Sequence, residues 1–151
     1  MKKTISGIMC GIIATGLLAG CQTEFSKFEY GEMSLPSVMV YKFIIDFDKR
    51  VLITQEGPSY SFNPTTKTIS LNPEQVSELQ KTLNRAGVTG WDDKYVRRGV
   101  CDGTFWKASY VLSDGKNRKI SGHMDWPYGF EKLSTAIEKL IKSNGEVKKW
   151  E

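Results

Sequence analysis

A cysteine, a histidine and two aspartates are the residues of this chain whose types point most directly to chemistry. Cys101 and Asp102 stand together, and His123 and Asp125 follow further along the chain. A cysteine beside a histidine can form a reactive thiolate, and a carboxylate can orient the imidazole ring. Cys101, His123 and Asp125 are therefore the candidate residues of a thiol-dependent enzyme.

A predicted hairpin has to bring these side chains together. The dipeptide Asp114-Gly115 is typical of a two-residue type I′ turn. Counting outward from this turn, we expect Trp106 to face His123, with Cys101 at the same end of the hairpin. The alternative is that the loop residues serve turn geometry only, with His123 a surface ring and Cys101 a buried small apolar residue. The spacing matches no cysteine-hydrolase signature, so the sequence favours this alternative.

The sequence predicts no metal site and no cofactor. A single histidine and one cysteine without paired spacing fall short of the usual ligand count for a transition metal. Asp92 and Asp93 are adjacent carboxylates, but no EF-hand pattern surrounds them. No phosphate-binding loop and no dinucleotide-binding glycine pattern is present.

Aromatic and basic residues crowd the second half of the chain. Tryptophan, tyrosine and arginine are enriched at binding hot spots, but large rings also supply the core of a small domain. We assign most of these rings to the core. Trp126 and Tyr128 precede a predicted helix, so they are the best candidates for exposed binding contacts. Arg97 and Arg98 are further binding candidates, suited to a solvated surface or to anionic lipid head groups.

The elements that position these residues follow from periodicity and capping. Period-two alternation over residues 39–47 predicts a half-buried strand. Asn72 predicts a helix N-cap, with Gln75 completing a capping box, and an apolar stripe from Phe130 predicts the last helix. Strand hairpins followed by helices indicate the α+β class. We expect a small antiparallel sheet built from hairpins, with two amphipathic helices packed on one face.

The amino terminus has the pattern of an export signal. Lys2 and Lys3 precede an apolar stretch over residues 5–18, which is short for a membrane-spanning helix. The stretch ends in Leu18-Ala19-Gly20-Cys21, which resembles the lipobox of bacterial lipoprotein precursors. This resemblance implies that residues 1–20 are removed as a signal peptide and that Cys21 carries the lipid. An uncleaved signal anchor with an incidental cysteine is the alternative.

The lipobox resemblance also changes the cysteine count and the charge. Cys10 leaves with the signal and Cys21 is blocked by lipid, so Cys101 is left without a disulfide partner. The whole chain has a net charge of +4, which falls to about +2 without Lys2 and Lys3. We expect no nucleic-acid partner. Gln22 after the anchor implies the outer membrane, facing the periplasm, in a host with two membranes.

The expected organisation places one domain behind the anchor. Residues 21–36 are predicted to be the lipidated cysteine and a polar tether, 37–145 a single globular α+β domain, and 146–151 a C-terminal tail. A second resemblance, to small uncharacterised bacterial lipoproteins, implies no activity. It covers about the last third of the chain and is carried by Cys101-Asp102-Gly103-Thr104-Phe105-Trp106, Ser113-Asp114-Gly115, Pro127 and Phe130.

These observations together favour a membrane-anchored, non-enzymatic binding module of the cell envelope. The membrane is reached through Cys21, and the expected partner is an envelope protein, a toxin or a glycan. The alternative function is the thiol-dependent enzyme that uses Cys101, His123 and Asp125.

Overall fold

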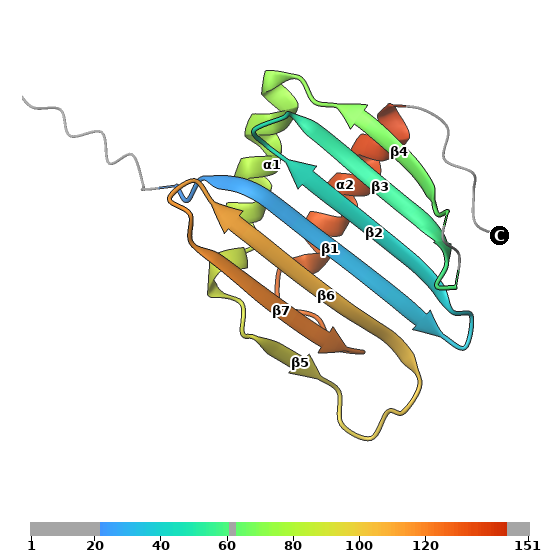
Figure 1. Cartoon of the computed structure of the whole chain (residues 1–151). Coiled ribbons are helices and arrows are strands. Elements are labelled where there is room, and N and C mark those ends of the chain that lie inside the picture. Colours follow the sequence, from blue (N-terminus) through green and yellow to red (C-terminus); the bar gives the residue numbers. More distant parts are fainter. Residues whose placement is uncertain (1–21, 61–62, 145–151) are drawn as a thin grey trace, which may run out of the picture.

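The computed structural model describes residues 22–60 and 63–144 (Figure 1). The predicted signal peptide, the lipid site at Cys21 and the tail over residues 146–151 lie outside these described residues. No helix in the described ranges is long and apolar enough to cross a membrane. The elements in chain order are β1 (Phe25–Leu35), β2 (Met39–Asp46), β3 (Val51–Pro58), β4 (Thr65–Ser70), α1 (Pro73–Arg85), the 3₁₀ turn η1 (Val88–Gly90), β5 (Lys94–Val96), β6 (Gly103–Leu112), β7 (Asn117–His123) and α2 (Phe130–Ser143).

The strands form one mixed sheet in the order β4-β3-β2-β1-β6-β7-β5. Neighbouring strands pair antiparallel, except that β5 pairs parallel to β7. Strands hold 44% of the described residues and helices 25%. The predicted fold class, a small antiparallel sheet with two amphipathic helices packed on one face, is therefore wrong. The sheet dominates the structure, and it includes a strand, β1, where a polar tether was predicted.

The central strand β1 corrects the predicted tether. β1 pairs with β2 on one side and with β6 on the other, so the tether assigned to residues 21–36 is wrong from Phe25 to Leu35. Phe28 and Tyr30 on β1 are buried, whereas Glu29 between them lies on the opposite face. When one face of an antiparallel sheet packs on the core and the other faces solvent, a strand needs apolar residues only at every second position. The average composition of such a strand is therefore polar.

The core lies between the sheet and the two helices, which run behind the strands in Figure 1. Its centre is aromatic. The ring of Phe130, at the start of α2, lies 4.8 Å from that of Tyr30 and 6.3 Å from that of Trp106. Trp91 and Trp106 are 4% and 2% exposed. The assignment of most of the rings to the core is thus confirmed, since each buries a large apolar area.

The predicted start of α1 is confirmed. Asn72 accepts a hydrogen bond from the Gln75 N–H at 2.8 Å, and the Gln75 side chain accepts one from the Asn72 N–H at 2.9 Å. This capping box satisfies two amide groups that the first turn of a helix leaves without partners. The last helix also begins at Phe130, as its apolar stripe predicts.

Two amide side chains of α1 hold the beginning of β1. Gln80 accepts from the Phe25 N–H at 2.9 Å and donates to the Phe25 carbonyl at 2.6 Å. Asn84 pairs in the same way with Thr23, at 3.0 and 2.7 Å. Residues four apart on a helix share a face, as do residues two apart on an extended chain. This amide clamp therefore fixes the chain from Thr23 onward.

Removing half of the clamp is expected to loosen the start of β1. Gln80→Ala leaves the partly buried N–H and carbonyl of Phe25 without partners, which costs about 1–3 kcal/mol. Urea unfolding should show this loss, and amide hydrogen exchange at Phe25 should accelerate. Lys81→Ala is the control, since its surface ion pair with Glu78 contributes at most about 1 kcal/mol. Unchanged protection of the Phe25 amide in Gln80→Ala would contradict the clamp.

The turn between β6 and β7 has a different form from the predicted one. Gly115 donates its N–H to the Leu112 carbonyl at 2.9 Å, and Leu112 donates to the Lys116 carbonyl at 2.8 Å. Gly115 has a φ of +86°. This is the pattern of a three-residue loop that ends in a left-handed glycine, rather than of a two-residue type I′ turn.

The extra loop residue shifts the hairpin register by one. Phe105 pairs with His123, and Trp106 pairs with Gly122, so the predicted pairing of Trp106 with His123 is wrong. Because successive side chains of a strand alternate between faces, one residue of register decides which side chains are buried. Trp106 points into the core, and Phe105 and His123 lie together on the face away from the helices.

Gly122 is the residue that makes room for Trp106. A Cβ atom on Gly122 would lie 2.2 Å from Cε2 of the indole, which is anchored by a 2.7 Å hydrogen bond from its Nε1 to the Asp125 carbonyl. Gly122→Ala is therefore expected to destabilise the fold by about 1–3 kcal/mol through overpacking. Chemical denaturation measures this. Gly90→Ala, where an added Cβ has no atom within 4 Å, should stay within about 0.5 kcal/mol of the wild type; equal stability of the two variants would refute this packing.

Candidate functional site

The predicted cysteine–histidine site is not assembled as a catalytic triad. Cys101 is exposed in the loop before β6, rather than buried. The His123 Nε2–H donates to the main-chain carbonyl of Asp102 at 3.1 Å, because a carbonyl oxygen can only accept. The imidazole also stacks on Phe105, with ring centroids 4.0 Å apart. Across residues 22–60 and 63–144, no hydrogen bond joins His123 to the Cys101 thiol or to the Asp125 carboxylate.

This geometry predicts how the thiol reacts. Cys101 should be fully alkylated by iodoacetamide in the folded protein, because its side chain is exposed. His123→Ala should leave the alkylation rate within about twofold, because the imidazole bonds to the Asp102 carbonyl and no hydrogen bond joins it to the Cys101 sulfur. A large slowing in His123→Ala, at equal folded content, would show that the histidine activates the thiol.

The four predicted binding residues fall in two separate places. Tyr128 is 91% exposed, and Trp126 is half-buried, with its Nε1 donating to the Tyr30 hydroxyl at 3.3 Å. Both line an open hollow of about 460 Å³ on the helix side of the sheet. Arg97 and Arg98 follow β5 and are exposed. No hydrogen bond or ion pair in the described part of the chain links these arginines to Trp126 or Tyr128.

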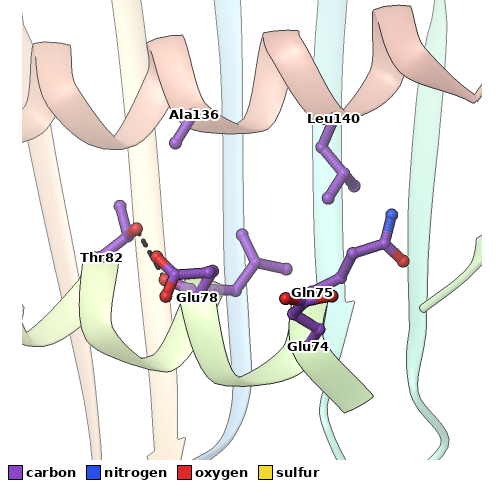
Figure 2. Close-up of a pocket in the computed structure, with 7 residues that line it drawn as sticks. Glu74, Gln75, Glu78, Thr82, Ala136 and Leu140 are labelled. Atoms are coloured by element: carbon purple, nitrogen blue, oxygen red, sulfur yellow. Dashed lines mark hydrogen bonds between the residues drawn. The ribbon is translucent and has the colours of Figure 1, made fainter. Parts of the chain in front are cut away.

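A second hollow, of about 290 Å³, lies between α1 and α2 (Figure 2). Figure 2 shows Ala136 and Leu140 of α2 directed toward α1. Two polar groups of the hollow are engaged by α1 itself: Glu78 pairs with Lys81 at 2.8 Å, and the Thr82 hydroxyl donates to the Glu78 carbonyl at 2.7 Å. Every polar residue of the lining comes from α1, so polar groups do not converge from both walls as they do in a typical ligand site.

The face of the sheet away from the helices, here called the outer face, carries side chains in rows across the strands. One row joins Met33, Phe105, His123 and Val96 on the neighbouring strands β1, β6, β7 and β5, and we call it the apolar row. Phe105 is 38% exposed and Val96 46% exposed. Phe105 and Val96 lie on the two strands that flank β7, and clusters of exposed apolar side chains mark interaction surfaces.

A basic row runs beside the apolar row, at a distance of two residues on each strand. It contains Lys107 on β6, Ser121 on β7 and Lys94 on β5, which pair directly across the strands. Lys119 follows on β7, opposite Ser109. Two strand spacings separate the backbones of Lys107 and Lys94, which is about 10 Å. The three lysines therefore form a compact group on the outer face.

The acidic residues of the outer face are engaged elsewhere. Glu29 lies 2.7 Å from Lys42 and 3.5 Å from Lys27. Partial burial raises the pKa of Glu29, but the two lysines outweigh this effect and the pKa is lowered. Asp46 pairs with Lys49 at 3.4 Å. By contrast, Lys94, Lys107 and Lys119 are exposed and have no ion pair within the described residues.

The outer face is thus the strongest candidate site in the structure. Phe105, Lys94 and Lys107 belong to the aromatic and basic residues that crowd the second half of the sequence, and composition alone does not separate them from the core. The alternation of β6 was the available signal, because it separates Phe105 and Lys107 from the buried Trp106. No group of three or more histidine, cysteine, aspartate or glutamate side chains in the described ranges has the arrangement of a metal site.

Comparison with known proteins finds no family model and no curated protein that matches this chain.

Proposed function

We propose that this protein is a lipid-anchored protein of the bacterial envelope that binds a partner, without catalysis, through the outer face of its sheet. The observation that carries the proposal is the group of exposed, unpaired lysines beside the apolar row. Like charges held close together repel, and a binding partner of opposite charge relieves this repulsion. Within residues 22–60 and 63–144, no hydrogen bond joins His123 to Cys101 or Asp125, so the thiol-enzyme alternative has less support.

The anchor in this proposal comes from the lipobox-like Leu18-Ala19-Gly20-Cys21. The amide clamp holds Thr23, so a single residue, Gln22, separates the proposed lipid site from the ordered chain. Lipid on Cys21 would hold the clamped end of the sheet close to the bilayer. Two or three acyl chains make such anchoring stable, whereas one chain binds only marginally.

The direction of β1 supports a separation of the proposed anchor from the outer-face rows. The apolar row meets β1 at Met33, eight residues beyond the start of the strand at Phe25. At about 3.3 Å per residue this is about 26 Å along the strand. Arg97 and Arg98 follow the end of β5 at the same side as His123. This placement supports a partner above the membrane rather than lipid head groups as the target of the two arginines.

The anchor is tested by fractionation of the native host. The wild-type protein should remain with the membranes, and Cys21→Ala should be released or held as a precursor. Cys101→Ala is the matched control and should remain membrane-bound. Equal membrane association of Cys21→Ala and the wild type, with no acyl mass on the mature chain, would contradict the anchor.

The binding face is tested by photo-crosslinking in intact cells. A photoreactive phenylalanine analogue in place of Lys107 should give an adduct of defined mass, because Lys107 lies on the outer face. The same analogue in place of Lys132, an exposed lysine of α2, is the control and should give none. Adducts from the Lys132 position alone would place binding on the helix side and refute the proposal.

A further inference from the structure

We infer that the outer face binds an acidic, amphipathic polypeptide segment that lies across the strands, with apolar side chains on the apolar row and carboxylates on the lysines. This inference rests on the proposed function and specifies the chemistry of its partner. It follows from the order of the two rows, from their charge and from the orientation of the exposed rings.

The two rows have the dimensions of one amphipathic segment. The apolar row extends to Val40 on β2, which pairs with Met33, so the row crosses the five strands from β2 to β5. Four strand spacings amount to about 19 Å, the length of about 13 helical residues. The basic row lies two residues along each strand, about 7 Å away. An amphipathic helix, about 10 Å wide, covers both rows at once.

The partner is expected to be negatively charged, because the outer face carries lysines that have no ion pair among the described residues. Glu29 and Asp46 already have lysine partners, whereas Lys94, Lys107 and Lys119 have none among the described residues. A partner with carboxylates beside its apolar face complements these lysines. Such complementarity accelerates the encounter and fixes the orientation of the bound segment.

The rings favour a polypeptide over a glycan. The rings of Phe105 and His123 are nearly parallel, 6° apart, and stack face to face, so each ring covers one face of the other. Met33 is the cross-strand neighbour of Phe105 on its other side. One face of each ring is therefore already covered and closed to stacking by a sugar. Phe105 and Val96 are exposed apolar side chains of the kind that pack against apolar side chains of a polypeptide.

The inference is tested with three fluorescent peptides of about 14 residues. The first is an acidic amphipathic helix, the second has the same apolar positions with lysine in place of glutamate, and the third is a scrambled acidic sequence. The acidic amphipathic peptide should bind most tightly by fluorescence anisotropy. In ¹⁵N spectra of the protein it should shift the amides of the apolar and basic rows.

Two charge-reversal variants of equal net charge locate the binding site. Lys107→Glu with Lys119→Glu should weaken binding of the acidic amphipathic peptide by about tenfold. Lys132→Glu with Lys139→Glu, on the exposed side of α2, should leave it unchanged. All four side chains are exposed, and dispersed ¹⁵N spectra verify that both variants fold.

Several outcomes overturn the inference. These are equal binding of the basic peptide, equal binding of the scrambled peptide, peptide-induced shifts confined to α1 and α2, and an equal effect of the two charge-reversal pairs. The wild-type protein could bind phosphatidylglycerol vesicles more tightly than it binds the peptide. If the Lys107→Glu, Lys119→Glu variant then fails to bind the vesicles, the outer face is assigned to lipid. Crosslinking from Lys107 to a glycan would also overturn the inference, while leaving the proposed binding function in place.

Discussion

The register of the β6–β7 hairpin is the constraint on which the rest of the structure depends. Gly115, in the left-handed region, closes a three-residue loop, and the pairs along both strands follow from it. This register places Trp106 over Gly122 in the core. The same register places Phe105 beside His123 on the outer face. A slip of one residue would reverse both sets, because the side chains of a strand alternate between its two faces.

The second organising element is β1, which joins the two halves of the sheet. Its buried side chains reach the rings of β2 and of α2: Tyr30 lies 5.4 Å from Phe43 and 4.8 Å from Phe130, measured between ring centroids. The clamp from Gln80 and Asn84 ties its beginning to α1. The chain therefore enters the fold at one end of the sheet and runs directly toward the end that carries the apolar row. In the proposed envelope protein, anchoring and recognition are separated along this strand.

Local signals predicted both helices, the strand β2 and the β6–β7 hairpin, but they predicted neither β1 nor β5. The capping box at Asn72 depends on residues three apart in sequence, so it is visible without any tertiary contact. β1 has no such local signal, because its charged residues pair across the outer face, as Glu29 does with Lys42. β5 is a three-residue strand whose pairing with β7 is entirely non-local. Strand assignment of such segments depends on neighbours that the sequence does not identify.

In the candidate site, one wrong choice of turn length changes which residues are predicted to pair across the hairpin. The dipeptide Asp114-Gly115 correctly indicates a turn, but the dipeptide fits loops of two and of three residues. The two-residue choice pairs Trp106 with His123 and suggests a catalytic cluster near Cys101. The three-residue loop in the structure leaves a stacked pair, Phe105 and His123, beside unpaired lysines. The sequence already favours binding over the thiol-enzyme alternative, and the observed register moves the candidate binding surface to the outer face.

Nuclear Overhauser contacts of the His123 ring test this account most directly. The structure predicts contacts from the imidazole protons to the ring of Phe105, since the centroids are 4.0 Å apart. It predicts none to the indole of Trp106, which lies on the other face of the sheet. Contacts from His123 to Trp106, with none to Phe105, would show the two-residue turn and would contradict the outer face described here.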